Sequence, residues 1–221
     1  MTQVREPETA SHAPVASAAD PYSAALRHGG SLYLHRPGGR RQRLDLARWC
    51  AEPDAADDTM LARCTGPTLD IGCGPGRLAA ALTRRGRPAL GIDLVPAAVA
   101  RALAAGATAL CRSVFDPLPG EGRWAVALLA DGNIGIGGNP EALLHRVRQL
   151  LRPGGTILAE VAPPGTRSRV DRLRLRRGPR AGDWFGWATV SASDIQRIGL
   201  AGGFAEVDCW TAHGRWLARL H

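Results

Sequence analysis

The stretch LDIGCGPGRLAAAL, residues 69–82, decides the fold of this chain. A short apolar run ends in Asp70, a loop carries Gly72, Gly74 and Gly76, and a helical pattern of Leu and Ala follows directly. Glycine lets the backbone turn tightly and approach a ligand closely, because no Cβ stands in the way. The first N–H groups of the following helix add hydrogen-bond donors at the same place. We therefore predict a strand–loop–helix unit that binds a ligand.

Apolar runs and helical patterns alternate from this stretch onward. Each run is short, nearly continuous and bounded by Gly, Pro or Asp, as expected for strands that are buried on both faces of a sheet. The predicted fold class is α/β, a doubly wound, mainly parallel seven-stranded sheet with a reversed C-terminal hairpin strand. The predicted strands span 68–72, 88–94, 107–111, 124–130 and 155–161, with a closing hairpin over 205–220; the predicted helices span 77–86, 95–106, 139–152 and 191–204.

The composition excludes several classes of enzyme. The chain has 221 residues and a formal net charge of +8, and all 28 basic side chains are Arg because Lys is absent. P-loop nucleotidases, Schiff-base enzymes that use their own Lys, and short-chain dehydrogenases with a Tyr-x-x-x-Lys motif are therefore excluded. Abundant Arg, Ala and Gly with very little Asn is typical of a GC-rich bacterial genome, so the basic charge alone is a weak indication of nucleic-acid binding.

The sequence predicts neither a membrane protein nor a metalloprotein. No apolar run approaches the roughly 18 residues needed to span a bilayer. The first twenty residues lack the basic and apolar regions of a secretory signal, which predicts a cytoplasmic protein. Five cysteines lie far apart without a C-x-x-C pair, so we expect no metal site and no disulfide framework.

We divide the chain into three parts. Residues 1–20 are predicted to form a mobile tail, because Pro, Ala, Ser and Glu follow no apolar period there. Residues 21–65 are predicted to form an N-terminal cap segment, with a helix and then a hairpin that turns at Pro37-Gly38-Gly39. Residues 66–221 are predicted to form the ligand-binding domain, interrupted by an Arg-rich lid insertion near 163–190.

The glycine loop resembles the first motif of class I S-adenosylmethionine-dependent methyltransferases, an acidic residue followed by G-x-G-x-G. Asp70, Gly72, Gly74 and Gly76 match that motif, whereas the dinucleotide motif G-x-G-x-x-G does not fit. The resemblance implies a Rossmann-like methyltransferase fold over about residues 60–220. It also implies S-adenosyl-L-methionine as cofactor, with S-adenosyl-L-homocysteine as product, and it places Cys73 at the cofactor within the loop.

The resemblance also assigns residues to the ribose and the adenine. Asp93 ends the next predicted strand, where the family binds the ribose hydroxyls, and Leu94 follows it. The alternative for Asp93 is a helix cap before Pro96. Ser113 and Val114 occupy the adenine position, where the family often has Asp or Asn and then an apolar residue. The competing candidate is Asp116, which could equally be a turn residue.

We choose the candidate residues for catalysis and substrate binding because we expect them near the carboxyl ends of the strands, where ligands bind in such sheets. Asp131 could orient or deprotonate the acceptor, and the exposed turn residue His213 could act as a base. The alternative for Asp131 is a loop carboxylate that hydrogen-bonds its own backbone. The alternative for His213 is an ordinary surface histidine. The candidate substrate contacts are Tyr22, His28, Asn133 and Trp184.

Three functions fit these observations. The first is methyl transfer to an O, N or C nucleophile of a small molecule, and the loop after residue 130 lacks the N-P-P-Y motif of amino-directed nucleic-acid methyltransferases. The second is an RNA methyltransferase that uses the Arg-rich segment 167–180, whose net charge is 7 − 1 = +6. The solvated face of a lid strand is the alternative for that segment. The third is a catalytically silent regulatory protein that binds S-adenosylmethionine.

Overall fold

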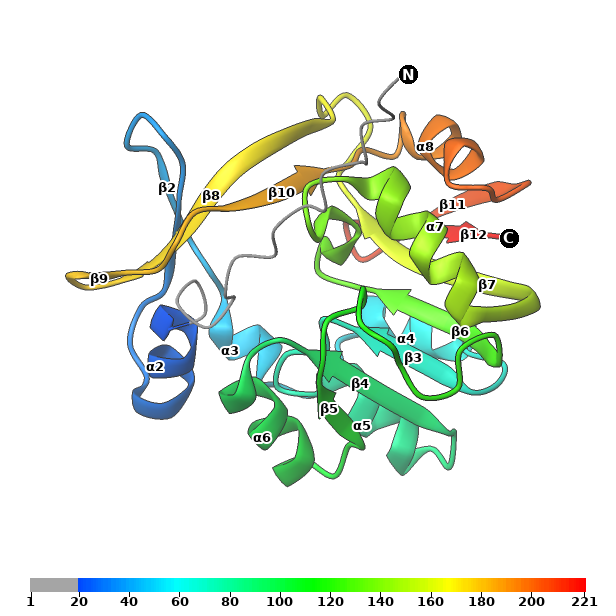
Figure 1. The fold of residues 1–221 in the computed structure, drawn as a ribbon, viewed down its shortest axis with the longest axis horizontal. Coiled ribbons are helices and arrows are strands. Elements are labelled where there is room, and N and C mark those ends of the chain that lie inside the picture. Colours follow the sequence, from blue (N-terminus) through cyan, green and yellow to red (C-terminus); the bar gives the residue numbers. More distant parts are fainter. Residues whose placement is uncertain (1–19) are drawn as a thin grey trace, which may run out of the picture.

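The structure is a computed structural model that describes residues 20–221. The mobile tail predicted for residues 1–20 therefore lies outside the described residues, except for Asp20, which begins helix α2 (Asp20–His28). The described chain consists of a large sheet with helices on both faces and a smaller sheet beside it (Figure 1). Within these residues, no helix is both long and apolar enough to cross a bilayer.

The large sheet confirms the predicted fold class. It has seven strands in the order β11-β12-β7-β6-β3-β4-β5. The pairs from β5 to β7 are parallel, whereas β12 is antiparallel to both β7 and β11, which makes it the reversed strand. The strands are β3 (Thr68–Ile71), β4 (Ala89–Asp93), β5 (Ala109–Cys111), β6 (Trp124–Leu129), β7 (Leu151–Val161), β11 (Val207–Ala212) and β12 (Arg215–Leu220).

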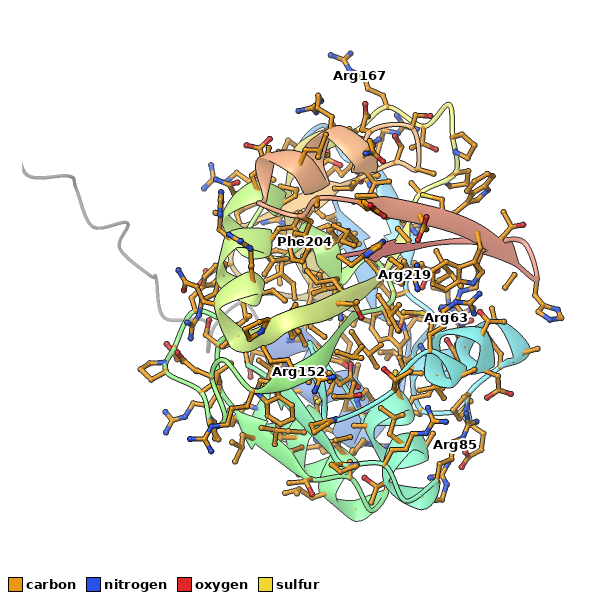
Figure 2. The ribbon with its side chains drawn as sticks, turned by 90° about the vertical axis from the view of Figure 1, so that its right-hand side faces the viewer. Arg63, Arg85, Arg152, Arg167, Phe204 and Arg219 are labelled. Carbon is orange, nitrogen blue, oxygen red and sulfur yellow. The ribbon has the colours of Figure 1, made fainter. Side chains whose placement is uncertain are left out.

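Alternate side chains of β6 enter two separate hydrophobic cores, which is why this strand reads as a continuous apolar run. Ala127 and Leu129 join the core that contains α7 and α8. Val126 and Leu128 join the core that contains α4 and α5 on the opposite face. The helices are α4 (Ala55–Ala62), α5 (Arg77–Arg84), α6 (Pro96–Ala104), α7 (Pro140–Leu150) and α8 (Ile195–Ala201), with a 3₁₀ turn η1 (Asn133–Gly135) after β6. Figure 2 shows Phe204 within the first of these cores, beside α7 and α8.

The smaller sheet joins two segments that lie far apart in the sequence. It contains β1 (Tyr33–His35), β2 (Arg41–Arg43), β8 (Arg169–Arg177), β9 (Arg180–Ala181) and β10 (Phe185–Thr189). We call it the cap sheet. Its order is β10-β8-β1-β2, with β9 also paired to β8 (Figure 1). The N-terminal hairpin and the Arg-rich insertion are therefore one structure, a pairing that sequence patterns did not predict.

Two local predictions were wrong, and one helix was missed. The second half of the predicted hairpin holds only β2, after which Asp45 caps a short helix α3 (Leu46–Trp49) by accepting from Arg48 N. Helix α4 was not predicted, although Asp54 and Asp57 form a capping box at its start. Helix α8 begins at Ile195 rather than at Ser191, because Ser191 pairs with Ala162 at the end of β7.

Gly76 offers a test of how the glycine loop is packed. Its φ is +89°, and an added Cβ would lie 2.6 Å from the Cβ of Ala102 and 2.7 Å from its Cα. We expect Gly76→Ala to lower the free energy of unfolding by about 2–4 kcal/mol, since left-handed strain and overpacking add together. The melting temperature should fall by roughly 2–4 °C for each kcal/mol in a chain of this size.

Gly106→Ala is the matched control for this substitution. Gly106 has nearly the same φ, +87°, but no atom lies within 4 Å of the added Cβ. This variant should lose only the left-handed strain, about 1–2 kcal/mol. Equal losses in the two variants would show that the contact with α6 does not constrain the loop.

Candidate functional site

The glycine loop between β3 and α5 is held against the end of β4. The backbone N–H groups of Gly72 and Cys73 both donate to the carbonyl of Ile92, at 2.8 and 2.9 Å. The Cys73 side chain packs over Gly91, where an added Cβ would lie only 2.7 Å from its sulfur. Burial, and then Asp70 and Asp93, raise the pKa of the Cys73 thiol. Cys73 is therefore a packing residue of the loop that keeps its proton.

Asp93 holds the loop and the start of α6 together. Its Oδ2 accepts from Gly74 N at 2.9 Å, and its Oδ1 accepts from Val95 N at 2.8 Å. Burial raises the pKa of this carboxyl, and the N–H donors oppose the rise. The N-cap residue of α6 is Val95, so Asp93 is not a simple helix cap. Each carboxylate oxygen still has a second lone pair, which leaves Asp93 able to accept hydrogen bonds from a ligand.

Asp70 lies beneath the loop as a buried carboxyl group. Its side chain is 2% exposed, and its Oδ2 has no hydrogen-bond partner among the described residues. Burial, with added repulsion from Asp131 and Asp93, raises its pKa to about 7. A buried acceptor without a partner is costly, so this oxygen is suited to a ligand that brings a donor or a positive charge.

Aromatic residues of the N-terminal segment cover the loop. The Tyr22 hydroxyl lies 3.3 Å from the place where a Cβ on Gly74 would stand. The Tyr22 ring meets that of Trp49 edge to face, with 5.8 Å between the centroids. Burial, followed by the charge of Asp93, raises the pKa of Tyr22 well above its usual value. The phenol of Tyr22, a predicted substrate contact, is therefore a neutral donor that lies over the glycine loop.

The predicted adenine residues form a compact turn after β5. Ser113 Oγ accepts from Phe115 N at 3.1 Å, and Ser113 N donates to Asp116 Oδ2 at 3.0 Å. Both competing candidates thus bond their own loop backbone. Val114 is buried in the core, whereas Leu94, at the end of β4, is 40% exposed. Leu94 is therefore an open apolar surface at this edge of the sheet.

Asp131 follows β6 in a strained backbone conformation, with φ +54°. Its Oδ1 accepts from Arg48 and its Oδ2 from Arg77, both at 2.6 Å, and its N–H donates to Glu160 at 2.9 Å. Each oxygen of this carboxylate is thus held by a guanidinium group, from α3 on one side and from α5 on the other. The arrangement favours a positioning role for Asp131 over that of a proton acceptor.

Asp131 belongs to a partly buried charge cluster, centred on the buried Asp57 and Arg77, that sequence patterns did not predict. Asp57 is fully buried and pairs with Arg77 and with Arg215, the latter at 2.8 Å. Arg215 also binds Glu160 through Nη2 at 2.6 Å. The spacing of the α4 capping box could have located Asp57, but nothing local links it to β12. The members of the charge cluster are Arg48, Arg77, Arg215, Asp54, Asp57, Asp131 and Glu160.

The remaining predicted residues lie in different places. Asn133 contacts the glycine loop, because its Nδ2 donates to the carbonyls of Ile71 and Gly72 at 2.9 and 3.0 Å. His213 is exposed in the turn between β11 and β12. His28 lines a cavity of about 650 Å³ at the far end of α2. Trp184 lies under the guanidinium of Arg174, 4.6 Å from the ring centroid.

Comparison with known proteins identifies the family. A family model described as a methyltransferase domain matches residues 40–207, and the chain belongs to this methyltransferase family. No curated protein sequence matches the chain. A methyltransferase from Bacteroides fragilis, S-adenosylmethionine-dependent and bound to S-adenosyl-L-homocysteine, is 22% identical over 95% of both chains, with a TM-score of 0.77.

Two further structures share the fold. The 1,6-didemethyltoxoflavin-N1-methyltransferase of Burkholderia thailandensis, with 1,6-didemethyltoxoflavin and S-adenosylhomocysteine bound, is 20% identical. The match covers 98% of this chain and 92% of that chain, with a TM-score of 0.61. The CcbJ methyltransferase of Streptomyces caelestis is 14% identical over 92% of this chain and 97% of that chain, with a TM-score of 0.60. The fold is therefore that of S-adenosylmethionine-dependent methyltransferases over nearly the whole chain.

The charge cluster predicts a large difference between two arginines of α5. Arg77→Leu leaves Asp57 and Asp131 short of a partner in a buried setting, and we expect a loss of about 3 kcal/mol in the free energy of unfolding. Arg84→Leu removes only an exposed pair with Glu52, which is worth less than about 1 kcal/mol. Chemical denaturation of both variants measures the difference. Similar losses would mean that the charge cluster does not hold the fold together.

Proposed function

We propose that this protein transfers a methyl group from S-adenosylmethionine to a small-molecule nucleophile. The observation that carries the proposal is the pair of carboxylates at the glycine loop. Asp93 reaches the loop backbone from the end of β4, and Asp70 presents a buried oxygen without a partner beneath it. Together with membership of the methyltransferase family, this arrangement supports a site for a ligand that has both hydroxyl groups and a positive charge.

The residues present fit the cofactor. Asp93 would accept hydrogen bonds from the ribose hydroxyls, and Asp70 would hold the ammonium side. Gly72 and Gly74 let Asn133 and the Tyr22 hydroxyl pack directly against the loop, and the exposed Leu94 offers apolar surface to the adenine, with Ser113 as polar neighbour and Val114 buried beside it. When bound, the cofactor supplies a methyl group already activated by its sulfonium. The protein then mainly has to align the acceptor and exclude water.

A small acceptor fits the covered site better than a polymer. Tyr22 and Trp49 lie over the loop, and the cap sheet contacts η1 through Trp187, which pairs with Ile136. In this proposal residues 66–221 carry the cofactor site, and residues 21–65 share the cap with the insertion near 163–190. The cap encloses the acceptor, while the charge cluster positions the loop at the methyl end and Asp131 is not the base. Turnover with candidate small molecules would separate this function from that of a silent regulatory protein.

Cofactor binding gives the direct test. The protein should bind S-adenosylhomocysteine and not NAD in calorimetry. Asp93→Asn should weaken S-adenosylhomocysteine binding roughly ten- to a hundredfold, since charge-assisted hydrogen bonds are worth about 1.5–3 kcal/mol each. The variant should also melt at a lower temperature, because its amide NH₂ must face the N–H of either Gly74 or Val95.

The control for Asp93→Asn is Asp208→Asn. Asp208 is an exposed carboxylate on β11 that pairs with Arg219, and its substitution should leave the affinity for S-adenosylhomocysteine unchanged. Affinities are compared well below the melting temperature, so that only folded protein is measured. NAD binding without S-adenosylhomocysteine binding would overturn the proposed function.

Asp70 should make cofactor affinity depend on pH. With a pKa of about 7 in the free protein, its carboxyl is about one-tenth ionised at pH 6 and about nine-tenths ionised at pH 8. Only the ionised form attracts an ammonium group, so S-adenosylhomocysteine should bind about tenfold more weakly at pH 6 than at pH 8. Asp70→Asn should bind more weakly than the parent at pH 8 and remove this dependence. The same pH profile in parent and variant would exclude Asp70 as its source.

A further inference from the structure

The Arg-rich strand β8 has two faces of different character. Alternate residues of a strand point to opposite faces of its sheet. Asp171, Leu173 and Leu175 lie on one face with Arg177, whose Nε donates to Gly29 O at 2.9 Å beyond the end of α2. Leu173 is 2% exposed. This inner face turns toward α2, which lies below the cap sheet in Figure 1.

The other face of the cap sheet is basic and carries aromatic rings. The strand register sets Arg43, Tyr33 and Arg176 side by side in one row across β2, β1 and β8. The next row contains Arg41, His35 and Arg174, and Trp184 continues it beside Arg174. Arg172 begins a third row. We call this set the outer face: Tyr33, His35, Arg41, Arg43, Arg172, Arg174, Arg176 and Trp184.

The charges of the outer face are not balanced within the described residues. None of its five arginines makes an ion pair in residues 20–221, whereas Arg36 and Arg169 on either side both pair with Asp171 of the inner face. Like charges in neighbouring rows repel one another, so this arrangement is unfavourable without an anionic partner. A GC-rich genome explains why these residues are Arg rather than Lys, but it does not explain why they share one face.

The side chains of the outer face indicate which class of ligand it can bind. Guanidinium groups bind phosphate through two parallel hydrogen bonds and also stack on rings. The Arg41 guanidinium lies 5.3 Å from the centroid of Tyr33, and Arg174 lies over Trp184. Arg174 Nε is buried without a hydrogen-bond partner in the described chain. A sheet face with interleaved arginines and rings is suited to a flexible chain of phosphates and unstacked bases.

We infer that the outer face of the cap sheet binds single-stranded nucleic acid as a docking partner, not as methyl acceptor. A lipid surface fits less well, because Val170 is the exposed large apolar residue of β8 and no apolar cluster accompanies it. The inner face meets α2 through Arg177 and Gly29, and the end of the outer face at Val170 and Gly186 packs against Gly138, away from the two rows around Tyr33 and His35. The inference is independent of the proposed function, since none of the outer-face residues is among those proposed above to hold the cofactor.

The test is fluorescence anisotropy with labelled twelve-residue oligouridine and oligothymidine. If about four phosphates are neutralised, affinity should fall about fiftyfold from 50 to 200 mM KCl, because the salt dependence for single strands has a slope of about −0.7 per contact. Arg41→Ser, Arg43→Ser and Arg172→Ser combined should weaken binding at least tenfold, since all three side chains are exposed and carry no ion pair within residues 20–221. A duplex of the same length should bind more weakly than the single strand.

The matched control replaces three other exposed arginines with Ser, Arg112, Arg123 and Arg152. Figure 2 shows Arg152 on the main body of the molecule, near the large sheet. This triple variant removes the same charge and should bind within twofold of the parent. Equal losses in both triple variants, binding only to anionic phosphatidylserine vesicles, or no oligonucleotide binding at 50 mM KCl would each overturn the inference. Methyl transfer to the oligonucleotide would overturn its docking role, whereas the calorimetry above tests the cofactor site separately.

Discussion

The carboxylate of Asp57 is the constraint on which the arrangement of this protein depends. It is fully buried, and an ionised carboxylate in that position has to be neutralised. Arg77 from α5 and Arg215 from β12 meet it, and Arg48 from α3 lies nearby. Four elements from both ends of the chain are thereby held at one point. A buried ion pair is not strongly stabilising in itself, but removing one member leaves the others unpaired.

The same cluster holds the loop that follows β6. Arg48 and Arg77 hold Asp131 in place, and this loop continues into η1, where Asn133 bonds the carbonyls of the glycine loop. The charge cluster and the glycine loop are therefore connected through Asp131 and Asn133. Asp131 also contributes to the raised pKa of Asp70, so the electrostatics of the two regions are connected as well.

Charge is distributed in two contrasting ways in this protein. In the charge cluster, Arg side chains alternate with carboxylates and satisfy one another at short distance. On the outer face of the cap sheet, the arginines stand in rows without acidic neighbours. Burial accounts for much of the difference, because Asp57 and Arg77 are buried and need partners within the protein, whereas the exposed Arg41, Arg43 and Arg172 can bind an anion from solution. The Arg-rich segment that the sequence suggested as a lid thus has an inner structural face and an outer charged one.

Local patterns were sufficient to predict the seven-stranded sheet, its reversed strand and the glycine loop, because strand burial, helix periodicity and glycine turns depend on neighbouring residues. They failed where short elements carry weak signals, as in α3 and in the start of α8. Only the tertiary structure could pair β1 with β8 or bring Arg215 to Asp57, since these contacts join residues more than 130 positions apart. The tertiary structure also determined the contacts of Asp131, a residue that its position in the sequence had suggested as a general base. Contacts of that range depend on how complete elements pack, and no local spacing encodes them.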